Sequence, residues 1–95
     1  MNTDTDATIR RIVADHGRLS VDPTGLDSTS DLYSLGLTSH ATVNVMLALE
    51  EAFEIEFPDE MLRKDTFASL AAMDEVVGKL LGDRRIRDLA GSQGA

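Results

Sequence analysis

Residues 39–53, SHATVNVMLALEEAF, place apolar side chains at helical spacing and contain neither glycine nor proline. Because Thr38 or Ser39 can cap the first turn, the stretch predicts a helix from about residue 39 to about residue 53. Apolar side chains cover much of its circumference, so we expect the helix to lie centrally in a bundle or to keep one face for a partner. On a helical wheel four side chains point to the core: Val45, Met46, Leu49 and Phe53.

An amphipathic helix is predicted upstream, over about residues 5–16, from capping residues at its start and apolar residues at helical spacing. Gly17 follows as a typical residue beyond a helix end. Residues 18–38 then form a long connection rich in turn-forming residues, and such a loop is usually functional or well packed. Its apolar residues are spaced as if they held it against a core: Leu19, Val21, Leu26, Leu32, Leu35 and Leu37.

Two further helices are predicted downstream. Pro58 fits the first position of a short helix. Two of its side chains are expected to point inward, Met61 and Leu62. Either Thr66 or Ser69 begins a longer helix, in which apolar residues recur by three, four and seven until Gly82 ends it, with an extension by a turn or two through Ile86 and Leu89 as the alternative.

These patterns predict an all-α fold, a small four-helix bundle of three main helices and one short helix, with a long loop between the first two. The 95 residues suffice for one domain, expected over residues 5–82 between a flexible N-terminus, residues 1–4, and a frayed or disordered tail, residues 83–95. Only 4% of the residues are aromatic, so the core should be mainly aliphatic. The absence of cysteine excludes disulfides, thiolate metal sites and thiol catalysis.

The chain is acidic, with a formal net charge of −8. Residues 19–62 contain nine acidic residues and no Lys or Arg, a distribution that argues against nucleic-acid binding. Within them, residues 32–49 carry no formal charge apart from the titratable His40. An uncharged surface with acidic residues around it suggests a site where a partner docks, with the surrounding acids steering its approach. The alternative is that the acids cluster by chance on a face exposed to solvent. With no signal peptide or membrane span evident, a cytoplasmic monomer is expected.

Ser39 is the main candidate for chemistry, because it lies where the loop meets the central helix. The free N–H groups and the dipole of a helix N-terminus favour a phosphate attached to such a hydroxyl, whereas a simple N-cap is the structural alternative. Ser39 and His40 do not form a nucleophile and base pair, since adjacent helical side chains diverge by about 100°. Neither an EF-hand nor a transition-metal site is indicated.

Residues 31–39, DLYSLGLTS, carry a family resemblance that continues through residues 42–43, 46–53, 57–60 and 66–70. These runs resemble the acyl and peptidyl carrier proteins, which bear a 4′-phosphopantetheine arm, and the likeness extends over about residues 5–82. The resemblance implies that Ser39 is the attachment serine, to which a phosphopantetheinyl transferase joins the arm of coenzyme A. The arm's thiol then holds cargo as a thioester, so the protein would be a carrier and not an enzyme.

The family's usual Asp-Ser-Leu is replaced here by Thr38-Ser39-His40. Together with the uncharged central helix, this makes the chain similar to discrete aminoacyl carrier proteins, which stand-alone ligases load before a downstream acceptor enzyme takes the cargo. The alternatives are an acyl carrier for a specialised lipid or polyketide pathway and an unmodified helical interaction module. Contacts with partner enzymes are expected at Ser39 and around it, at Leu37, Thr38, His40, Val43, Asn44 and Leu47.

Overall fold

The computed structural model describes residues 3–94, and side chains are described for residues 4–82. Within that range the chain forms three α-helices and three short 3-10 helices and no strand. In order these are α1 (Thr3–His16), η1 (Pro23–Gly25), α2 (Ser39–Phe53), η2 (Asp59–Met61), η3 (Lys64–Phe67) and α3 (Leu70–Gly94). The all-α class is confirmed, and α2 has the predicted bounds, but the short fourth helix of the predicted bundle is a 3-10 turn.

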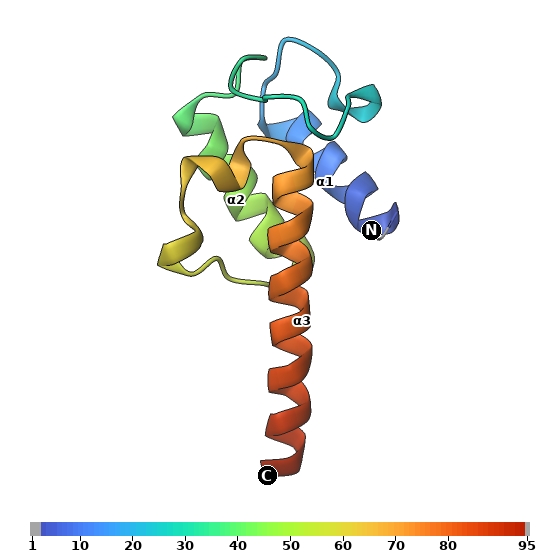
Figure 1. Cartoon of the computed structure of the whole chain (residues 1–95), viewed down its shortest axis with the longest axis vertical. Helices are drawn as coiled ribbons and strands as arrows, with labels where there is room; N and C mark the ends of the chain where they lie inside the picture. The colour runs from blue at the N-terminus through green and yellow to red at the C-terminus, as the bar shows by residue number, and fades with distance from the viewer. Residues whose placement is uncertain (1–2, 95) are drawn as a thin grey trace.

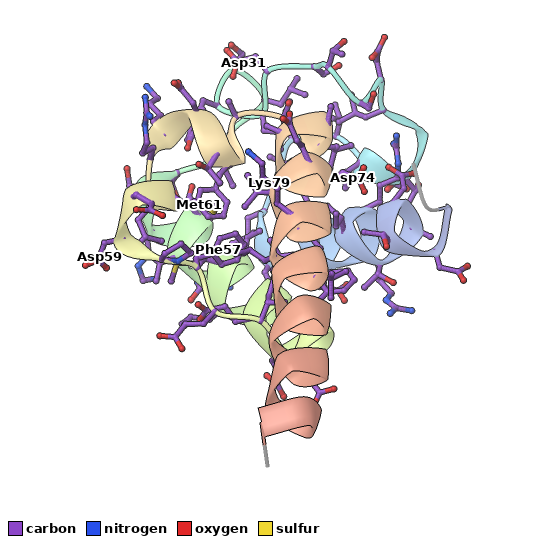
Figure 2. All side chains as sticks on the ribbon, turned by 60° about the horizontal axis from the view of Figure 1, so that its bottom comes forward. Asp31, Phe57, Asp59, Met61, Asp74 and Lys79 are labelled. Carbon is purple, nitrogen blue, oxygen red and sulfur yellow. The ribbon has the colours of Figure 1, made fainter. Side chains whose placement is uncertain are left out.

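Figure 1 shows α1 and α2 beside the first half of α3, with the long loop covering one end of the three helices. The second half of α3 extends away from them. The core between the helices is mainly aliphatic, as predicted, and its largest fully buried side chains include Ile9, Leu32, Leu49 and Met73. Phe57, labelled in Figure 2, packs against the ring of Phe67 with centroids 5.5 Å apart.

The start of α1 lies at Thr3, so two residues of the predicted flexible N-terminus, residues 1–4, are helical, and residues 1 and 2 lie outside the described range. At the other end, the N–H of Gly17 donates to the carbonyl of Val13 at 2.8 Å. A Cβ on Gly17 would lie 2.7 Å from that oxygen, so the close approach requires glycine. The left-handed residue is the next one, Arg18, with φ of 53°.

The long loop is held against the helices by buried side chains and hydrogen bonds. The N–H of Leu32 donates to the carbonyl of Ala68 at 2.8 Å, and Leu32 is fully buried. From α1, Nη1 of Arg10 donates to the carbonyls of Pro23 and Leu26 at 2.9 and 2.6 Å. The loop is therefore packed, as predicted, although Val21 is exposed, because the loop has no regular period that fixes which side chains face inward.

The boundaries of α3 differ in part from the prediction. Ser69 is its cap, since its Oγ accepts from the N–H of Ala72 at 3.1 Å, whereas Thr66 belongs to η3. The prediction that Gly82 ends the helix was wrong, because α3 continues to Gly94. One helical glycine costs only about 1 kcal/mol relative to alanine, and five of the eight residues from 83 to 90 are Arg, Leu or Ala, which favour helices. The domain border at residue 82 stays a prediction.

The predicted inward direction of Leu62 was also wrong. The turn η2 runs from Asp59 to Met61, so Pro58 is its N-cap and not, as predicted, its first residue. Met61 is partly buried against the core, while Leu62 follows the helix end and is 46% exposed. A 3-10 helix has a different side-chain period from an α-helix, which explains why α-helical spacing placed Leu62 wrongly.

Candidate functional site

The loop segment before α2 is shaped by one acid and one glycine. The carboxylate of Asp31 accepts from the N–H of Tyr33 at 3.0 Å and from the hydroxyl of Ser34 at 2.8 Å. The Ser34 hydroxyl is the main cause that lowers the pKa of Asp31 below its ordinary value. Gly36 has φ of 108°, a conformation that L side chains rarely adopt, and it redirects the chain toward the start of α2.

The N-cap of α2 is Thr38, which decides between the two predicted capping residues. Its Oγ1 accepts from the N–H of Ala41 at 3.0 Å, and its carbonyl accepts from the hydroxyl of Thr42 at 2.8 Å. Ser39 is thus the first helical residue, and it is exposed. The simple N-cap alternative for Ser39 is therefore wrong, and the Ser39 hydroxyl is left available at the helix N-terminus.

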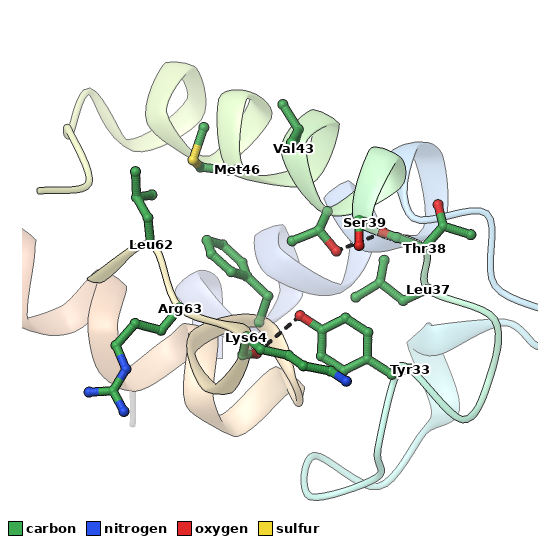
Figure 3. A pocket seen from close by; sticks show the side chains of 11 residues that line it. Tyr33, Leu37, Thr38, Ser39, Val43, Met46, Leu62, Arg63 and Lys64 are labelled. Atoms are coloured by element: carbon green, nitrogen blue, oxygen red, sulfur yellow. Dashed lines mark hydrogen bonds between the residues drawn. The ribbon is translucent and has the colours of Figure 1, made fainter. Parts of the chain in front are cut away.

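A cavity of about 690 Å³ opens beside Ser39, between α2 and the segment that contains η2 and η3 (Figure 3). Its apolar walls include Val43, Met46 and Leu62, and its basic edge is formed by Arg63 and Lys64. The other lining residues are Tyr33, Leu37, Thr38, Thr42 and Phe67. Sequence reasoning missed this cavity, since it depends on contacts between α2, the loop and η3.

The exposed side of α2 carries most of the predicted partner-binding residues. Val43 is 50% exposed and Leu47 52% exposed. Thr38, His40 and Asn44 are exposed as well. By contrast, Leu37 is buried, so its side chain belongs to the core and to the cavity wall rather than to the outer surface.

The predicted core side of α2 is confirmed where it is fully buried, at Val45 and Leu49. Met46 and Phe53 are only partly buried against that core, and Met46 also lines the cavity. Among the residues described, no group of three or more His, Cys, Asp or Glu side chains is placed to hold a metal ion. The same described part of the chain has no helix long and apolar enough to cross a membrane.

The structure is thus a small helical domain in which an exposed serine begins the central helix beside a cavity with apolar walls. Residues 7–73 match the family model described as "Phosphopantetheine attachment site". The chain belongs to this family, so it is a carrier and not an enzyme, and its prosthetic group is 4′-phosphopantetheine. The exposed Ser39 hydroxyl fits this group, which when attached supplies the thiol that the cysteine-free chain lacks.

Known carriers resemble the chain over most of its length. It is 45% identical to the "Aminoacyl carrier protein" of Agrobacterium fabrum over 76 residues, 80% of this chain and 92% of that protein. It also matches one chain of a crystal structure, that of an engineered Bradyrhizobium japonicum glycine:[carrier protein] ligase complexed with carrier protein from Agrobacterium tumefaciens and AMP. That match has a TM-score of 0.74 and 45% identity over 77% of this chain and 97% of the other.

A solution structure from Agrobacterium tumefaciens matches with a TM-score of 0.67 and 42% identity, covering 85% of this chain and 98% of the other. Relatives at this identity share the fold of the chain. The similar solved structures therefore support the same assignment as the family model.

Proposed function

We propose that this protein carries an activated amino acid as a thioester on a 4′-phosphopantetheine arm attached to Ser39. The observation that carries the proposal is the position of Ser39 as the exposed first residue of α2, while Thr38 caps the helix. Because Thr38 satisfies the N–H of Ala41, modification of the Ser39 hydroxyl removes no capping hydrogen bond. The family match over residues 7–73 includes this serine.

The attachment step uses the oxygen of Ser39. A phosphopantetheinyl transferase would bring coenzyme A to it, Ser39 Oγ would bond to phosphorus, and adenosine 3′,5′-bisphosphate would leave. The hydroxyl proton must pass to a base of the transferase, because His40 is adjacent in the helix and diverges from Ser39 by about 100°. The chain itself contributes an accessible nucleophile and a helix N-terminus that favours the phosphate.

An aminoacyl cargo is supported by the relatives. One is named an aminoacyl carrier protein, and a carrier of similar fold is complexed with a glycine:[carrier protein] ligase. We therefore propose an amino acid:carrier protein ligase as the loading partner, a downstream acceptor enzyme as the receiver and the cytoplasm as the location. The acyl carrier and the unmodified interaction module are the alternatives that the experiments below distinguish.

The exposed side of α2 is proposed as the docking surface for the ligase. We define this surface as Thr38, His40, Val43, Asn44 and Leu47. It holds no carboxylate, and its two large apolar residues are about half exposed, so it suits an apolar partner surface rather than a strongly basic one. The acidic residues that flank α2 in sequence can steer the encounter from the rim.

Intact mass spectrometry after incubation with coenzyme A and a broad-specificity phosphopantetheinyl transferase tests the attachment. The wild type should gain one phosphopantetheine, and Ser39→Ala should gain none. Ser34→Ala is a matched control, since Ser34 is another exposed serine of the same segment, and it should be modified like the wild type. A wild type that stays unmodified in the test and in its native host would favour the interaction module.

The loaded cargo is tested with the modified protein, ATP and a glycine:[carrier protein] ligase. Mass gain of an aminoacyl group that hydroxylamine removes would support the thioester. If amino acids fail with a panel of such ligases while an acyl ligase loads the arm, the acyl carrier alternative would replace the proposal.

A further inference from the structure

The cavity beside Ser39 has a cationic edge in an acidic chain. The protein carries a net charge of −8, and residues 19–62 contain no Lys or Arg. The first two cations after this stretch, Arg63 and Lys64, both line the cavity that Ser39 also lines. Figure 3 shows them on the η3 side, with Ser39 on the α2 side. Two cations therefore border the cavity that Ser39 also lines.

Tyr33 holds Lys64 at two points. The hydroxyl of Tyr33 donates to the carbonyl of Lys64 at 3.0 Å, and the Lys64 ammonium lies 5.0 Å from the centroid of the Tyr33 ring. Tyr33 lines the same cavity, so both contacts keep the lysine at its edge (Figure 3). A lysine ammonium on a flexible stem can leave an aromatic ring for an anion without a change in the backbone.

The neighbouring acids leave this ammonium available. Arg63 lies 3.7 Å from the carboxylate of Asp65, whereas among the described side chains no carboxylate lies within ion-pair distance of Lys64. Lys64 acts on Asp31 only through a minor electrostatic effect, and that carboxylate already accepts hydrogen bonds from Tyr33 and Ser34. Of the two cations at the cavity, Lys64 is thus the one whose charge is not already paired with a carboxylate within ion-pair distance among the described side chains.

We infer that Lys64 is a positioning residue whose ammonium pairs with the phosphate joined to Ser39. The inference rests on the proposed attachment at Ser39. A phosphodiester there carries one negative charge, and Lys64 borders the same cavity from the opposite wall. The ion pair orients the base of the arm along the cavity between α2 and η3, rather than leaving it to turn freely in solvent.

The test compares unmodified and arm-bearing forms of the wild type, Lys64→Gln and Lys79→Gln. Lys79 is a matched control, because it is exposed on α3 and does not line the cavity (Figure 2). Mass spectrometry first establishes the arm on Ser39, and thermal unfolding at low salt then gives the change in Tm on attachment. We expect this change to be about 2–4 °C less favourable in Lys64→Gln than in the wild type, as for one partly exposed ion pair in a small domain.

The phosphorus NMR signal of the attached phosphate provides a second readout. It should move when salt is added to the wild type and to Lys79→Gln, and move less in Lys64→Gln. If Lys64→Gln bears the arm but matches the wild type in both measurements, the role of Lys64 is refuted while Ser39 stands. If the wild type gains no arm at Ser39, both proposals fail together.

Discussion

Replacing Val43 by alanine is expected to weaken the binding of a loading ligase without weakening the fold. Val43 lies on the proposed docking surface of α2 and is 50% exposed. Alanine has a higher helix propensity than valine, so the free energy of unfolding should stay the same or rise by a few tenths of a kcal/mol. A loss of affinity in this variant would therefore come from the surface and not from unfolding.

The size of the effect follows from the exposed half of the side chain. The substitution removes two methyl groups, each worth about 0.8 kcal/mol when it is fully buried. Since half of Val43 is already covered in the free protein, a partner can bury only the other half, which is worth about 0.8 kcal/mol. This corresponds to an increase of about fourfold in Kd.

Titration calorimetry with a Bradyrhizobium japonicum glycine:[carrier protein] ligase measures this Kd, because a similar carrier is found in complex with such an enzyme. Val21→Ala is a matched control, as Val21 is 43% exposed but lies on the loop between α1 and η1. We expect the control to bind like the wild type. Equal Kd values for Val43→Ala and the wild type, or an equal loss in Val21→Ala, would refute the docking surface.

Three further predictions concern stability, each measured by urea unfolding. Thr38→Ala removes the acceptor of the Ala41 N–H and should lower the free energy of unfolding by about 1 kcal/mol; an unchanged value would mean that another group caps α2. Leu49→Ala, at a fully buried position, should cost about 2–5 kcal/mol, and a smaller loss would show that the core closes around the gap. Hydrogen bonds lower the pKa of three loop acids, Asp22, Asp27 and Asp31. The stability that these carboxylates contribute near neutral pH should therefore be lost as the pH falls from about 4 through their lowered pKa values. A free energy of unfolding that does not change over this pH range would contradict the prediction.

The bounds of α2 could be predicted from the sequence because they depend on residues that are close together in the chain. Apolar spacing without glycine or proline fixes where the helix runs, and the structure gives Ser39–Phe53 as expected. The choice of cap could not be made, since Thr38 and Ser39 both have hydroxyls that cap helices. It depends on the extended backbone of Thr38, with ψ of 164°, which the loop imposes.

The cavity could not be predicted because it is assembled from distant residues. Tyr33 and Lys64 are 31 positions apart, and no local pattern announces the hydrogen bond or the ring contact between them. One signal was present, since the acidic stretch ends with two adjacent cations at Arg63 and Lys64. The sequence shows that the sign of the charge changes there, but only the fold shows that these two cations border the same cavity as Ser39.

The replacement of the family's usual aspartate by Thr38 has different consequences for the fold and for the site. Threonine keeps the capping hydrogen bond to Ala41, so the start of α2 does not need the acid. It also removes a negative charge from the residue next to the proposed phosphate, where a carboxylate would repel the phosphate and compete for the Lys64 ammonium. The change therefore preserves the helix while making the surroundings of Ser39 less acidic, so its effect should fall on the enzymes that recognise this surface rather than on folding.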